Sequence, residues 1–135
     1  MTCETIRMEL TTNPDFVSII RLTLSGIANK IGFSLDDIED IKVAVSEACT
    51  NAIKHSSDEK FYVTFELLEN GLTIEIEDKG TGYDMDCIAE PDLSNPKENG
   101  LGLFIIRTLM DEVSTTSKNN QGTIVKMTKY LGVGI

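Results

Sequence analysis

Residues 34–55, SLDDIEDIKVAVSEACTNAIKH, give the clearest structural signal in this 135-residue chain. Ser34, with Asp37 three positions later, resembles a capping box, in which side chains satisfy the free backbone groups of a helix start. Apolar residues then recur at helical spacing, which predicts one buried face. These residues are Ile38, Ile41, Val45, Cys49 and Ala52. The pattern predicts an amphipathic helix over residues 35–55.

Two polar residues of this helix, Glu47 and Asn51, are four positions apart, so their side chains leave the same face of the helix. That face points away from the apolar stripe, and the simplest interpretation is a solvated helix surface. Val43 and Ala44 flank the pair, which makes the face less hydrophilic than a purely solvated one. A functional pair is the alternative, and the helix alone does not decide between them.

A third polar position lies at the end of a predicted strand. Apolar and polar residues alternate over 72–76, and Asp78 continues the apolar parity, so its carboxylate is predicted to point inward. A buried carboxylate needs a partner, and the amine of adenine would supply one, with Gly80 and Gly82 allowing the backbone to approach closely. A strand ending in an Asp-Lys-Gly turn explains the local sequence equally well.

Glycines mark two further positions. Gly100-Leu101-Gly102 opens an apolar stretch, and its backbone N–H groups could face a phosphate, although glycine at an ordinary loop-to-helix junction gives the same pattern. Gly122-Thr123 is a weaker signal, because it is also expected of a hairpin turn followed by a β-branched strand residue.

The remaining elements follow from caps, alternation and turn residues. Residues 79–99 lose all regular pattern, and we interpret this long connection as a lid. The predicted order is strand, helix, helix, two strands, helix, two strands, which favours an α+β fold with a mixed or antiparallel sheet and helices packed on one face. The predicted ranges are 6–10, 14–31, 35–55, 61–67, 72–76, 101–111, 113–117 and 123–131.

Composition sets further bounds. A length of 135 residues predicts a single domain over 1–135, and a hydrophobic content of 41% is that of an ordinary globular chain. No apolar run is long enough to span a bilayer and no signal peptide is evident, so we expect a cytoplasmic protein. The net charge of -10 argues against nucleic acid, and three cysteines without short paired spacing argue against a zinc site or a disulfide framework.

The weak signals occur in one order, and in that order they resemble the GHKL (Bergerat-fold) ATPases. Residues 46–52, SEACTNA, resemble the N box of that superfamily, residues 78–82, DKGTG, its first glycine box, and residues 100–103, GLGL, its second. With residues 20–26, IRLTLSG, and 108–113, TLMDEV, the chain is similar over nearly its whole length to the bacterial anti-sigma-factor serine kinases.

The resemblance implies a role for each matching residue. Glu47 would be the general base, Asn51 would hold a Mg²⁺ bound to the ATP phosphates, and Asp78 would bind adenine. Residues 83–99 would close over the nucleotide as the ATP lid. The other implied ATP-binding residues are Gly80, Gly82, Gly100, Leu101, Gly102 and Thr123.

The resemblance also implies partners. Kinases of this kind phosphorylate a serine of a STAS-type anti-anti-sigma factor, sequester a stress-response sigma factor of the sigma-B type, and act as homodimers. Arg21 matches a position on the partner-binding surface, although a lone arginine on an amphipathic helix is more often an ordinary surface side chain. A nucleotide-dependent anti-sigma binding protein without efficient phosphotransfer stays open as the alternative. A sensor histidine kinase is disfavoured, because it needs a helical domain with a phospho-accepting histidine and the predicted elements include no such segment.

Overall fold

The computed structural model describes residues 4–56, 59–79, 98–118 and 122–132. They form five β-strands, three α-helices and one short 3-10 helix. In chain order these are β1 (Glu4–Thr11), η1 (Pro14–Phe16), α1 (Val17–Ile31), α2 (Leu35–His55), β2 (Lys60–Leu68), β3 (Gly71–Asp78), α3 (Glu98–Leu109), β4 (Glu112–Lys118) and β5 (Gly122–Tyr130).

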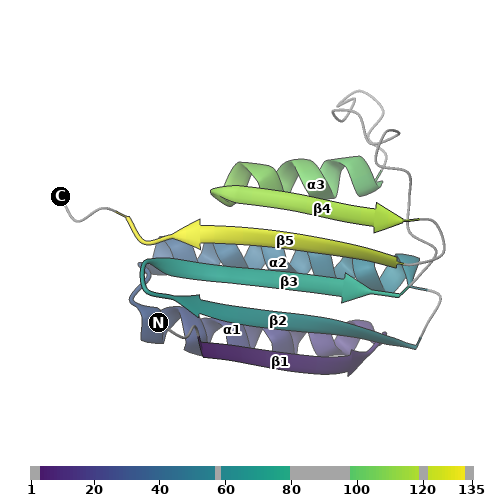
Figure 1. The fold of residues 1–135 in the computed structure, drawn as a ribbon, viewed down its shortest axis with the longest axis horizontal. Coiled ribbons are helices and arrows are strands. Elements are labelled where there is room, and N and C mark those ends of the chain that lie inside the picture. Colours follow the sequence, from purple (N-terminus) through teal and green to yellow (C-terminus); the bar gives the residue numbers. More distant parts are fainter. Residues whose placement is uncertain (1–3, 57–58, 80–97, 119–121, 133–135) are drawn as a thin grey trace.

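The strands form one sheet in the order β1-β2-β3-β5-β4, and every neighbouring pair is antiparallel. Figure 1 shows the three α-helices on one face of this sheet, with α2 behind its centre. Strand β5 lies between β3 and β4 in the sheet. The connection from β3 through α3 to β4 is therefore a crossover that leaves one strand position open for β5. The predicted α+β class and the one-sided helix layer are confirmed, and the described sheet is antiparallel rather than mixed.

Helix α2 has the bounds that its sequence predicts. The Ser34 hydroxyl accepts a hydrogen bond from the backbone N–H of Asp37 at 3.2 Å, which satisfies one free donor of the helix start. The predicted apolar stripe is buried, and so are Ala44 and Ala48 beside it. Burial raises the pKa of the Cys49 thiol to about 12, so this side chain stays a neutral part of the core at physiological pH.

The core lies between the sheet and the helices. Alternate residues of β2, β3 and β5 point into it and face one another across the strands, as in the row Phe65, Ile74 and Met127. Each fully buried side chain of this size contributes on the order of 1.5–3 kcal/mol through the hydrophobic effect. The largest are Phe61, Phe65, Ile20, Leu24, Ile41, Leu72, Ile74, Ile76, Leu103, Ile106, Met127 and Val45.

The third helix differs from its prediction. It begins at Glu98 rather than at residue 101, so Gly100 and Gly102 lie within its first turns and not in a loop before it. Glycine is unfavourable in a helix by only about 1 kcal/mol, which the tertiary packing of α3 on α2 overrides. Most of the predicted lid, residues 83–97, lies outside the described residues.

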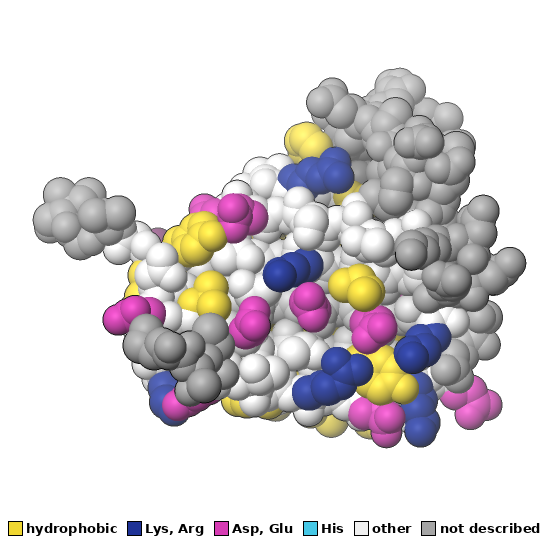
Figure 2. Space-filling model, viewed as in Figure 1, with side chains coloured by type: hydrophobic (Ala, Val, Ile, Leu, Met, Phe, Trp, Pro, Cys, Tyr) yellow, Lys and Arg dark blue, Asp and Glu magenta, His cyan; other side chains and the backbone are white. Residues whose placement is uncertain are grey.

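The other face of the sheet is polar. Figure 2 shows it with positive and negative side chains interspersed. Arg7 and Glu77 form one ion pair there at 3.6 Å, and the Arg7 guanidinium also stacks on the Tyr62 ring. Among the described residues no helix is both long and apolar enough to cross a membrane.

Candidate functional site

Helix α2 carries candidate residues on two of its sides. One side faces the sheet at the end of β3, and we call it the sheet flank; it comprises Ala48, Ala52, Ile76, Asp78, Gly122, Thr123 and Val125. The other side faces α3, and we call it the α3 flank; it comprises Glu47, Asn51 and Gly102. Asn51 also lines the small pocket of the sheet flank, so the two flanks adjoin at this residue in the C-terminal half of α2.

Asp78 dominates the sheet flank. It is the last residue of β3, it lies opposite Phe61 of β2 and Thr123 of β5, and only 5% of its surface is exposed. The inward position predicted from the parity of 72–76 is confirmed. An aspartate is rarely buried to this degree unless its carboxyl group has hydrogen-bonding partners.

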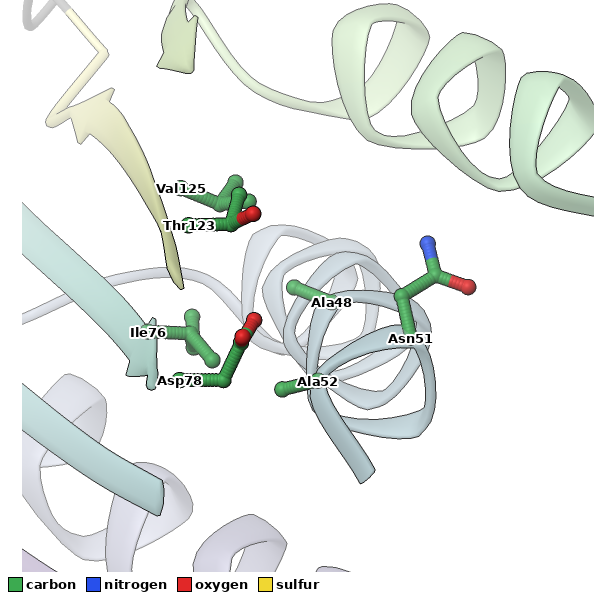
Figure 3. Close-up of a pocket in the computed structure, with 7 residues that line it drawn as sticks. All are labelled: Ala48, Asn51, Ala52, Ile76, Asp78, Thr123 and Val125. Atoms are coloured by element: carbon green, nitrogen blue, oxygen red, sulfur yellow. The ribbon is translucent and has the colours of Figure 1, made fainter. Parts of the chain in front are cut away.

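A small pocket opens beside Asp78. Figure 3 shows the Asp78 carboxyl group pointing from the end of β3 into the space between the sheet and α2, on the Ala48 side, with the Thr123 hydroxyl pointing toward α2 from β5. The enclosed volume is about 10 Å³, which is room for one water molecule. Asp78 and Thr123 form the polar floor of this otherwise mainly apolar pocket, which is too small to enclose a nucleobase but on which the edge of a larger ligand could rest.

Gly122 fixes the geometry of this floor. Its φ of +89° lies in the left-handed region, and a Cβ at this position would lie 2.1 Å from the carbonyl oxygen of Asp78. The backbones of β3 and β5 therefore come into close contact beside the pocket, and only glycine at position 122 permits this contact. Sequence reasoning treated Gly122 as a turn residue and missed this role. Its only signal was its position directly before Thr123.

The α3 flank brings three predicted residues together. A Cβ at Gly102 would lie 3.0 Å from Nδ2 of Asn51 and 3.4 Å from Oε2 of Glu47, so the absent side chain leaves room for both groups. Glu47 and Asn51 are half-buried rather than solvated. Figure 3 shows the Asn51 amide on the side of α2 away from Asp78. This helix face is therefore not the solvated surface of the simplest interpretation, and the functional role of the pair stays a prediction.

Other predicted residues lie elsewhere. Gly80 and Gly82 lie outside the described residues, and Gly100 and Leu101 lie in the first turn of α3. Arg21 is exposed on α1 and is not part of either flank. It lines an open groove of about 280 Å³ together with Ser18, Leu22 and Lys42.

The donor groups of the α3 flank suit Mg²⁺ bound together with phosphates. Within the described part of the chain no three His, Cys, Asp or Glu side chains come together as a metal cluster. Mg²⁺ commonly takes only one or two protein oxygens and completes its shell with water and substrate phosphates. The Asn51 amide oxygen, with the Glu47 carboxylate close by, is compatible with that kind of site.

Comparison with known proteins identifies the fold family. Residues 10–129 match the model of the histidine kinase-like ATPase domain. The chain is similar to two solved structures: the RsbU and RsbW domains of a Mycobacterium tuberculosis protein (TM-score 0.72, 20% identity, 95% of this chain) and the histidine kinase domain of a blue-light activated kinase from Erythrobacter litoralis (TM-score 0.56, 25% identity, 90% of this chain). It covers 32% and 62% of those longer chains.

Curated relatives narrow the family. The chain is 46% identical over 138 residues to the serine-protein kinase RsbW of Halalkalibacterium halodurans, covering 95% of this chain and 84% of that protein. It is 42% identical to the serine-protein kinase RsbW of Bacillus thuringiensis, covering 95% of this chain and 86% of that protein. The chain therefore belongs to the histidine kinase-like ATPase domain family and, within it, to the RsbW serine-protein kinases.

Proposed function

We propose that the two flanks of α2 form one site that transfers the γ-phosphoryl group of ATP to a serine of a partner protein. The observation that carries the proposal is the convergence of Glu47, Asn51 and Gly102 at the start of α3, on the same helix that borders buried Asp78. A carboxylate, an amide and glycines in the first turns of a helix suit phosphates and a hydroxyl nucleophile.

In this proposal the sheet flank holds the base. The Asp78 carboxylate accepts a hydrogen bond from the exocyclic amine of adenine, and Thr123 borders the same edge. Gly80 and Gly82 would shape the rest of the base pocket, and residues 83–99 would close over the nucleotide. Binding the base at a buried carboxylate fixes the phosphates relative to α3.

The α3 flank carries the chemistry. The serine oxygen attacks the γ-phosphorus, the bond from that phosphorus to the oxygen of the ADP leaving group breaks, and Glu47 accepts the serine proton. Gly100, in the first turn of α3, offers a backbone N–H group to the phosphates, and Leu101 and Gly102 would border the phosphates from the same part of the helix. Mg²⁺ held by Asn51 would offset phosphate charge when it is bound.

We further propose that the phosphate acceptor is a STAS-type anti-anti-sigma factor, and that the same chain, as a cytoplasmic homodimer, sequesters a stress-response sigma factor. The groove beside Arg21 is the proposed partner surface, where Leu22 is 74% exposed next to Arg21 and Lys42. A phosphoserine adds about two negative charges to a partner of a chain with net charge -10, which disfavours their complex.

The test mixes the purified chain, Mg²⁺, γ-labelled ATP and a STAS-type protein from the same source. We expect label on a serine of that partner, and loss of that label in Glu47→Ala. Thr50→Ala is the matched control, because Thr50 is an exposed residue of the same helix. Stable ATP binding without any transfer would reject the kinase proposal and leave a nucleotide-dependent anti-sigma binding protein.

A further inference from the structure

Three polar side chains form a row across the inner face of the sheet. Asp78 of β3 lies opposite Thr123 of β5, and Thr123 lies opposite Ser117 of β4. On β3 and β5 their neighbours on the same face are apolar, namely Ile76 and Val125, whereas the neighbour on β4 is Thr115. The row therefore extends the polar floor of the pocket from β3 to β4.

Ser117 contacts the hydroxyl that borders the pocket. Its Oγ lies 3.2 Å from Oγ1 of Thr123, within hydrogen-bonding distance, and either oxygen can be the donor. Thr123 is 3% exposed and lines the pocket, whereas Ser117 is half-buried. A threonine hydroxyl has one proton and two lone pairs and rotates freely unless a neighbour fixes it. Ser117 is placed to fix this rotation.

We propose that Ser117 is a positioning residue that orients the Thr123 hydroxyl and thereby raises the selectivity of the site for adenine over guanine. The inference rests on the proposed base site at Asp78. A carboxylate accepts hydrogen bonds, whereas the Thr123 hydroxyl beside Asp78 can also donate one. When Ser117 donates to Thr123, the proton of the Thr123 hydroxyl is free to point into the pocket.

This arrangement presents an acceptor and a donor side by side, directly or through the one water molecule that the pocket has room for. Adenine offers the complementary pair, an amine donor and a ring-nitrogen acceptor. Guanine offers a carbonyl oxygen and a ring N–H, which reverses both. Without Ser117 the Thr123 hydroxyl could rotate and accept a hydrogen bond from guanine as well as donate one to adenine. The preference for adenine over guanine would then weaken.

The experiment measures the affinity of the whole chain for ADP and for GDP by calorimetry, so that no transfer occurs. For Ser117→Ala we expect the ADP-over-GDP preference to fall by roughly 3- to 10-fold, the range of one lost hydrogen bond. Ser117→Thr keeps the hydroxyl on a strand-compatible side chain and should restore the preference. Ser114→Ala is the matched control, since Ser114 is exposed on the same strand and lies on the opposite face.

Three results would overturn the inference: a preference unchanged in Ser117→Ala, an equal loss of affinity for both nucleotides, or the same change in Ser114→Ala. The Asp78→Asn variant tells whether only the role of Ser117 is wrong or the proposed base site itself is wrong. If Asp78→Asn keeps normal ADP affinity, the proposed site is wrong. If it loses affinity while Ser117→Ala keeps its preference, only the role of Ser117 is wrong.

Discussion

The two flanks of α2 differ in how rigidly the fold specifies them. On the sheet flank, Asp78 and Thr123 are buried, and the backbones of β3 and β5 meet so closely that only glycine fits at Gly122. On the α3 flank, the half-buried ends of Glu47 and Asn51 meet a helix that is held by side-chain packing. A change on the sheet flank should therefore alter stability and base binding together, whereas a change on the α3 flank should alter phosphate binding and transfer with little effect on stability.

The largest effect is expected at Gly122. Alanine there would combine an unfavourable positive φ with a collision against the Asp78 carbonyl oxygen, so we expect Gly122→Ala to lower the free energy of unfolding by roughly 2–4 kcal/mol. Urea denaturation measures this loss, and ADP affinity should fall with it.

Gly26→Ala provides the control for Gly122→Ala. A Cβ at Gly26 meets nothing within 4 Å, and alanine in helix α1 should raise the free energy of unfolding by about 0.5–1 kcal/mol. If Gly122→Ala lowered the free energy of unfolding by less than about 1 kcal/mol, the sheet flank would not be more rigid than the α3 flank.

The α3 flank is tested by Gly102→Ala. The new methyl group must displace the ends of Asn51 and Glu47 by a few tenths of an ångström, and both are side chains with freedom to move. We expect stability within about 1 kcal/mol of the original chain and a roughly 10-fold lower rate of phosphoryl transfer, because positioning errors of this size affect chemistry first. Urea denaturation and a phosphoryl-transfer assay on the same preparation separate the effect on stability from the effect on the transfer rate. A loss of stability as large as that of Gly122→Ala would remove the distinction between the flanks.

A smaller effect is expected where β5 anchors the far end of α3. The Lys129 ammonium group donates a hydrogen bond to the carbonyl oxygen of Leu109 at 2.8 Å, at the C-terminal end of α3. Lys129→Met should lower the free energy of unfolding by about 1 kcal/mol and leave the ADP-over-GDP preference unchanged. Lys126→Met, exposed on the same strand, is the control and should change neither quantity. If Lys129→Met changed the ADP-over-GDP preference, the position of α3 would affect base selection on the sheet flank, contrary to our inference.

Local signals in the sequence predict much of this structure. The bounds of α2 follow from the Ser34 cap and the apolar spacing, and the inward Asp78 follows from strand parity, because both depend only on neighbouring residues. The close approach of Glu47 and Asn51 also follows from helix geometry.

Long-range contacts explain what sequence reasoning missed. Gly122 must be glycine because of Asp78, which is distant in the chain and becomes adjacent only when β5 inserts between β3 and β4. The contact between Ser117 and Thr123 likewise needs the register of two paired strands. The early start of α3 was missed because Gly100 was interpreted as part of a loop-to-helix junction, although packing on α2 overrides the low helix preference of glycine.

The most direct test of the divided site measures ADP affinity and phosphoryl transfer to the partner serine for Glu47→Gln and Asp78→Asn side by side. We expect Glu47→Gln to bind ADP within about threefold of the original chain but to transfer the phosphoryl group at least about 100-fold more slowly, because only the proton acceptor is lost. We expect Asp78→Asn to lose about 10-fold or more in ADP affinity. Normal transfer by Glu47→Gln, or normal ADP binding by Asp78→Asn, would contradict this division of roles.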